Sequence, residues 1–125
     1  MLVVIFRRIE ALQPYFYRLV TGGDTKTQKT RNWKSWKVYG ANFTTISDAV
    51  YNPDKWTLLD KRENISDAYL PMENCYPAAF NFTEGVSQPY YYYMVAVTES
   101  YGKDNDDGTH EDGIQQQMNE MYLCT

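Results

Sequence analysis

The longest strand-forming run in this sequence is Tyr90-Tyr-Tyr-Tyr-Met-Val-Ala-Val-Thr98. Aromatic and β-branched side chains dominate it, and both kinds fit the pleated surface of a sheet. Because successive side chains of a strand point to opposite faces, two of the four tyrosines should face inward and two outward. We expect the outward pair to lie on a solvated sheet face, although such a pair could also form a binding platform.

Other runs with the composition of strands lie on both sides of this one: Leu2–Phe6, Tyr15–Thr21, Trp36–Tyr39, Trp56–Leu59, Ala79–Phe82 and Gln117–Leu123. The one plausible helical turn is Thr45–Tyr51, which Pro53 would end. Short strands without intervening helices predict an all-β, antiparallel sandwich with less than about 15% helix. Alternation along these strands predicts that seven side chains lie inside: Trp36, Val38, Trp56, Leu58, Phe80, Val95 and Val97.

The bulk composition excludes several classes of protein. A formal net charge of −4 argues against wholesale binding to nucleic acid or to an anionic membrane. With 125 residues, the chain has room for a single domain, residues 1–125. No run approaches the ~20 apolar residues that span a bilayer, and the apolar run at residues 2–6 is too short for a signal peptide. Two cysteines, Cys75 and Cys124, allow either one disulfide or two free thiols.

Three segments, taken in order, carry a resemblance to a known family. The first is Tyr17-Arg-Leu-Val-Thr-Gly-Gly-Asp-Thr25, followed by Arg31-Asn-Trp-Lys-Ser-Trp-Lys-Val-Tyr-Gly-Ala-Asn42. The second is Lys55-Trp-Thr-Leu-Leu-Asp60, and the third is Tyr90–Thr98 closed by Gln117–Leu123. Over about residues 15–123 this order resembles the discoidin, or coagulation-factor type C, family, which includes bacterial family 32 carbohydrate-binding modules.

The resemblance implies a jelly-roll sandwich of the galactose-binding-like kind, with ligands at the loops on one end. It implies a non-catalytic carbohydrate-binding or adhesion module of a secreted or cell-surface protein, with a glycan, for example of the galactose type, as its ligand. Trp33 stands where the family usually has proline, and Gly23 where it usually has asparagine. The rival interpretation is a structural or protein-interaction domain without a glycan site, because one fold hosts many functions.

The loop Gly22–Ser35 contains the residues that we expect to bind a glycan. Sugars are held by an aromatic face and by planar polar groups, which Trp33, Arg31 and Asn32 supply. We add Asp24 from the same loop and Tyr101 from the loop that follows the longest strand. The alternative is that Asp24 and Arg31 only hold the loop together and that Trp33 packs over the sheet.

Two features bear on metals and on catalysis. The acidic run from Asp104 to Asp112 offers oxygen ligands, but it lacks the spacing of an EF-hand, since Gln115 occupies the twelfth place. Glu120 matches the glutamate of the family's last strand, and the resemblance therefore implies a structural calcium ion near it as the one candidate cofactor. His110 is the single histidine and has no nucleophile motif nearby, so we expect no enzymatic activity.

The opening third of the family pattern is absent, and residues 1–8 resemble a strand cut from the middle of such a domain. A sandwich without its first strands leaves a sheet edge unpaired and part of its core uncovered, and such edges recruit other strands. We therefore expect a homodimer in which the region around Leu2–Phe6, or its neighbouring edge strand, is buried between copies.

Overall fold

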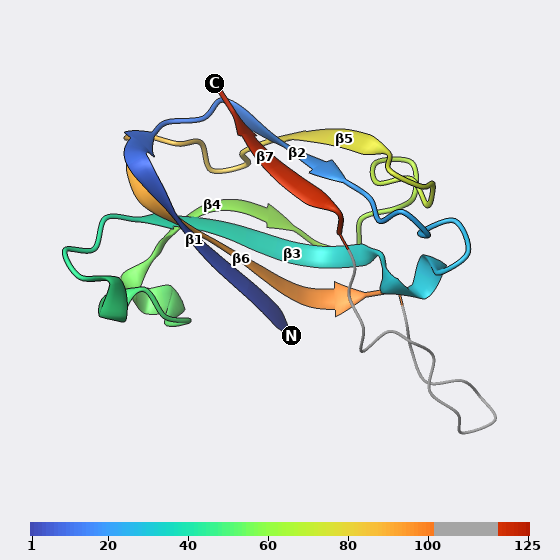
Figure 1. Ribbon diagram of the computed structural model, residues 1–125, viewed down its shortest axis with the longest axis horizontal. Coiled ribbons are helices and arrows are strands. Elements are labelled where there is room, and N and C mark those ends of the chain that lie inside the picture. Colours follow the sequence, from blue (N-terminus) through green and yellow to red (C-terminus); the bar gives the residue numbers. More distant parts are fainter. Residues whose placement is uncertain (102–117) are drawn as a thin grey trace.

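The computed structural model describes residues 1–101 and 118–125, which form two antiparallel sheets (Figure 1). The four-stranded sheet has the order β1-β6-β3-β4, and the three-stranded sheet has the order β5-β2-β7. The strands are β1 (Leu2–Leu12), β2 (Phe16–Val20), β3 (Trp33–Ala41), β4 (Thr57–Arg62), β5 (Pro77–Asn81), β6 (Tyr90–Ser100) and β7 (Glu120–Cys124). The predictions of an all-β chain and of a sandwich are confirmed.

The helical turn predicted at Thr45–Tyr51 is a single short 3-10 turn, η2 (Ile46–Asp48). Pro53 does not end it but begins the next 3-10 turn, η3 (Pro53–Lys55), because a proline at the first position of a helix loses no hydrogen bond. A third turn, η1 (Lys29–Arg31), precedes β3. The predicted strand Gln117–Leu123 begins at Glu120, and Gln117 lies outside the described residues.

The space between the two sheets is filled by aromatic and branched side chains. The Trp36 ring meets the Phe80 ring edge-on at 5.3 Å between centroids, and Tyr17 stacks on Phe80 at 5.5 Å. Val38, Val95 and Val97 are fully buried in the same cluster. The predicted interior positions at Trp36, Val38, Phe80, Val95 and Val97 are thus confirmed.

The outer face of the four-stranded sheet carries a second apolar cluster. Tyr92, Met94 and Ala96 of β6 lie there, and Phe43 packs on Trp56 and Tyr92 with ring centroids 5.0 and 5.6 Å apart. The prediction of a solvated outer face under the tyrosine run is therefore wrong, since only Tyr91 of the four is exposed. A strand that is covered on both faces needs no polar alternation, which explains the unbroken apolar composition of β6.

The predicted interior positions of Trp56 and Leu58 need correction. Trp56 is buried, but in the outer cluster, where its indole N–H donates to the Val50 carbonyl at 2.9 Å. Leu58 is half-buried against the same cluster, and Leu59 takes the inner position. The cause is a β-bulge, because Val38 pairs with Asp60 while the next residue of β3 pairs with Leu58. One extra residue on β4 reverses the faces that simple alternation predicts.

We predict that Gly40→Ala destabilises the sandwich by about 1–3 kcal/mol, because a methyl group there overpacks the core. A Cβ atom at Gly40 would lie 2.7 Å from Cδ2 and 2.8 Å from Cγ of the buried Tyr90 ring. Gly23→Ala is the matched control, since no atom lies within 4 Å of its added Cβ. Equal urea midpoints for the two variants would contradict the close approach of Gly40 and Tyr90.

Candidate functional site

Two long connections meet beyond the C-terminal end of β2, at residues 21–32 and 63–76, and we call this region the loop end. Backbone groups join them directly. The Thr21 amide donates to the Tyr76 carbonyl at 3.0 Å, and the Cys75 amide donates to the Gly22 carbonyl at 3.1 Å. The Lys26 amide donates to Asn74 Oδ1 at 2.8 Å. The loop end is therefore an ordered platform, although its chain is irregular.

Asn32 is the buried anchor of the loop end. Its Nδ2 donates to the Leu70 carbonyl at 3.3 Å, and its own carbonyl accepts the Tyr101 amide at 3.2 Å. Its Oδ1 has no hydrogen-bond partner among the described residues. A fully buried side chain cannot touch a sugar directly, so Asn32 positions its neighbours instead.

Asp24 and Arg31 are both half-buried in the first loop. The Asp24 carbonyl accepts the amides of Thr27 and Gln28 at 3.0 and 2.9 Å, which closes a tight turn. Arg31 ends η1, and its amide donates to the Gln28 carbonyl at 3.1 Å. Main-chain groups of both residues help to shape the loop, and both residues keep part of their surface accessible.

Trp33 does not form the exposed stacking face that we expected. It is 4% exposed, belongs to the core between the sheets and lies 5.8 Å from the Trp36 ring. The correction follows from where β3 begins, since the strand starts at Trp33 and carries its side chain inward. Its indole N–H has no hydrogen-bond partner among the described residues.

Tyr101 directly follows β6 and contacts Ile65 and Lys34. Its hydroxyl donates to the Ile65 carbonyl, and Lys34 Nζ lies 5.6 Å from the centre of its ring. Burial, aided by the nearby carboxylates of Asp67 and Glu99, raises the pKa of Tyr101 above its ordinary value. The structure thus brings Arg31, Asn32, Trp33 and Tyr101 together, but it buries the ring of Trp33 and leaves that of Tyr101 half-buried.

Glu120 comes from the start of β7, where it pairs with Val20 of β2. It is exposed and accepts a hydrogen bond from the Tyr122 hydroxyl. Within residues 1–101 and 118–125, no three His, Cys, Asp or Glu side chains gather as a metal site would require. The acidic run Asp104–Asp112 and His110 lie outside the described residues.

The sequence analysis missed Tyr69, an aromatic side chain that the loop end does expose. Tyr69 is 69% exposed. The next residue, Leu70, is fully buried, and its carbonyl accepts a hydrogen bond from the Asn32 side chain. The amides of Tyr69 and Leu70 both donate to the Ser66 carbonyl, at 3.0 and 3.2 Å, so the turn that carries the ring is ordered. The sequence signal for an exposed ring at this position is the presence of a tyrosine within a long polar loop.

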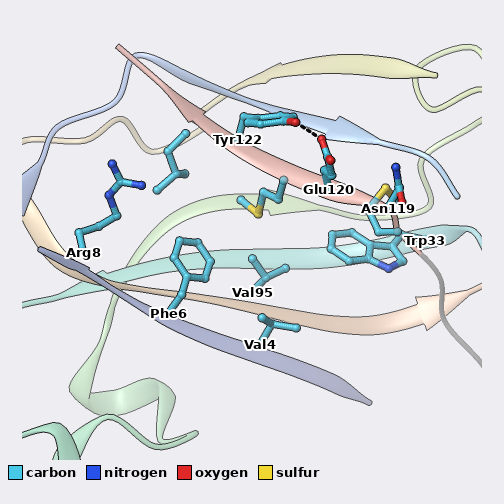
Figure 2. A pocket seen from close by; sticks show the side chains of 11 residues that line it. Val4, Phe6, Arg8, Trp33, Val95, Asn119, Glu120 and Tyr122 are labelled. Carbon is cyan, nitrogen blue, oxygen red and sulfur yellow. Dashed lines mark hydrogen bonds between the residues drawn. The ribbon is translucent and has the colours of Figure 1, made fainter. Parts of the chain in front are cut away.

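A groove lies between the sheets, along the side where β1 and β7 face each other (Figure 2). This groove has a volume of about 410 Å³. Val4, Phe6 and Arg8 line it from β1, Trp33 and Val95 from the four-stranded sheet, and residues 118–123 from the segment that includes β7. Its lining is mainly apolar, with Arg8 toward one end and Glu120 toward the other.

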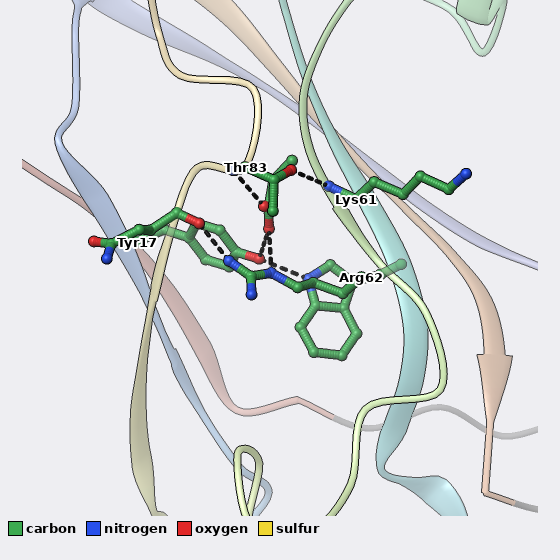
Figure 3. A network of polar contacts seen from close by, with 7 residues as sticks. Tyr17, Lys61, Arg62 and Thr83 are labelled. Atoms are coloured by element: carbon green, nitrogen blue, oxygen red, sulfur yellow. Dashed lines mark hydrogen bonds and ion pairs between the residues drawn. The ribbon is translucent and has the colours of Figure 1, made fainter.

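On the opposite side of the sandwich, a buried polar network joins the two sheets (Figure 3). The Asp60 carboxylate is fully buried and accepts hydrogen bonds from the Tyr17 hydroxyl, from Arg62 Nε at 3.0 Å and from the Thr83 amide at 2.9 Å. The Trp36 indole N–H donates to the Tyr17 hydroxyl at 2.8 Å. Because each polar group is satisfied by protein, this network supports the fold and offers no free reactive group.

Neither a protein-family model nor a curated protein matches this chain. The structure leaves Cys75 and Cys124 as free thiols, Cys75 being exposed and Cys124 half-buried. Among the described residues, no helix has the length and apolar character needed to cross a membrane.

We predict that Tyr17→Phe lowers the free energy of unfolding by about 2–3 kcal/mol. The substitution removes the hydroxyl that donates to Asp60 and accepts from Trp36, and leaves both partners buried and underbonded. Tyr15→Phe is the control, because Tyr15 is 81% exposed and its loss should change stability by less than about 0.5 kcal/mol. Urea unfolding followed by tryptophan fluorescence measures both, and equal stabilities would contradict the network's role.

Stability should fall steeply in alkali. Burial raises the pKa of Tyr93 to about 12, and burial together with the Asp60 carboxylate raises the pKa of Tyr17 as well. Above pH ~10 the unfolded chain releases these protons while the folded chain keeps them, so the free energy of unfolding decreases as pH rises. The contribution of Tyr93 is complete below pH ~10 and is lost by pH ~12. Urea titrations across this range should show a smaller decrease for Tyr93→Phe, and an unchanged decrease would refute the assignment.

Proposed function

We propose that this chain is a non-catalytic carbohydrate-binding module of a secreted or cell-surface protein, and that it holds a glycan at the loop end. The proposal follows the resemblance of Arg31–Asn42 and its companion segments to discoidin-like modules. One observation supports it: the Tyr69 ring is exposed and directly precedes Leu70, whose carbonyl accepts the hydrogen bond from Asn32.

The hydrogen bond between Asn32 and Leu70 joins the two loops that carry Arg31 and Tyr69. Arg31 directly precedes Asn32, and Tyr69 directly precedes Leu70, so both lie next to the hydrogen bond that joins the loops. An aromatic face packs against the C–H side of a sugar, and a guanidinium bonds its hydroxyls. In this proposal Tyr69 takes the stacking role first expected of Trp33, while Arg31 and Asp24 supply polar contacts.

The binding that such a site can provide is weak. One exposed ring and a few polar groups on a shallow surface suggest a Kd on the order of 0.1–1 mM. Modules of this strength act by holding a larger protein or a multivalent surface near its target, because linked weak sites gain avidity. The proposal therefore assigns binding and adhesion to the chain, and it assigns no reaction.

A protein-interaction domain without a glycan site is the second candidate. The observation that favours it is the apolar groove between β1 and β7, because exposed apolar recesses mark contact surfaces. The two candidates use separate parts of the molecule, so each can be tested without the other.

We predict that a glycan array identifies a ligand and that Tyr69→Ala weakens its binding at least about tenfold, equivalent to about 1.4 kcal/mol. Tyr15→Ala is the matched control, since Tyr15 is similarly exposed but precedes β2 at the other end of the sandwich. NMR titration with the identified glycan measures both variants and reports whether each stays folded. Equal affinities for Tyr69→Ala and the unsubstituted chain would refute this site, and an array without any ligand would refute the glycan proposal.

A further inference from the structure

In residues 1–101 and 118–125, nothing covers the side of the sandwich formed by β1 and β7. In the described part of the chain, β1 pairs with β6 alone and β7 pairs with β2 alone, so both strands are sheet edges. Edge strands present unpaired backbone N–H and C=O groups and invite another strand. Between these two edges lies the apolar groove, so an unpaired edge and an uncovered part of the core occur on the same side.

β1 is suited to this contact by its sequence. Val4 is 43% exposed although it faces the groove, and Phe6 is only half-buried beside it. Val3 and Ile5 point to the other face, where they join the outer cluster. A second strand laid along residues 2–6 would therefore find apolar side chains on both faces, with Arg7 and Arg8 at one end only.

The charges along the groove make it complementary to a copy of itself. Arg8 lies toward one end and Glu120 toward the other, and both side chains are exposed (Figure 2). Within the described residues, Arg8 has no ion-pair partner. A two-fold axis perpendicular to the sheets reverses the groove end for end, which brings Arg8 of each copy toward Glu120 of the other.

We propose that two copies of this chain form a dimer through these open sides, with β1 of one copy antiparallel to β1 of the other. The four-stranded sheet then continues across the dimer, and each groove is closed by its partner. The occupant is a second copy because the charge pattern is self-complementary and because both apolar grooves are covered by the same contact.

The register of this pairing follows from the charges and the groove. Centring the pair on Arg7 or Arg8 would set like charges opposite each other, which is destabilising. Centring it on Ile5 sets Val4 opposite Phe6 of the partner on the groove face and sets Arg8 opposite Leu2. This register joins the most apolar part of the two edges, and we adopt it as the proposed arrangement.

Light scattering coupled to size exclusion at micromolar concentration tests the dimer. The expected mass is twice the 14.7 kDa of one chain. Arg8→Glu and Glu120→Arg should each weaken dimerisation at least about tenfold, and the double variant should restore it. Lys55→Glu is the control, since Lys55 is exposed in η3, just before β4 at the opposite edge of the four-stranded sheet. A monomer at these concentrations, or a double variant that stays monomeric, would overturn the proposal and leave the groove to a different partner.

Cross-linking tests the register without depending on stability. In a background of Cys75→Ser and Cys124→Ser, Ile5→Cys should form a covalent dimer under mild oxidation, because self-opposed residues in an antiparallel pair lie ~4.5–5.5 Å apart. Ile9→Cys is the matched control, since Ile9 is the most exposed apolar residue of the same strand and would lie far from its copy. Cross-linking at Ile9 but not at Ile5 would overturn the arrangement.

Discussion

The buried carboxylate of Asp60 is the constraint on which the arrangement of the two sheets depends. A charge removed from water costs several kcal/mol unless partners surround it, and here they come from both sheets. Tyr17 approaches from the three-stranded sheet, Arg62 from the same strand as Asp60, and the Thr83 amide from the chain that follows β5 (Figure 3). The network therefore joins the two sheets at this point.

This network gives the sandwich a closed side and an open side. It lies where β4 faces the chain after β5, and the Glu84 amide also donates to the Leu59 carbonyl there at 3.0 Å. The edges β1 and β7 lie on the other side of the two sheets and are bridged by apolar side chains around the groove. The polar network thus joins the two sheets on one side, and the proposed dimer contact lies on the other.

The loop end is independent of that surface, and it owes its order to hydrogen bonds. Asn32 and Thr21 join the two long loops, and the Asp24 carbonyl closes a turn within the first of them. In the proposed function this order would hold the backbone of the site in place, and preorganised groups lose little entropy when a ligand binds. The two proposals place a glycan at one end of the sandwich and a second copy along one side.

The all-β class and the approximate position of each strand follow from the sequence alone, because aromatic and β-branched runs between polar loops are typical of strands. Alternation also identified Trp36, Val38 and Val95 as interior residues. It could not show that β6 is covered on both faces, or that a bulge places Leu59 instead of Leu58 in the inner core. Nor could it show that Trp33 is buried while Tyr69 is exposed. Those outcomes were decided only by the tertiary structure, because alternation separates the two faces of a strand but does not say what packs on either one.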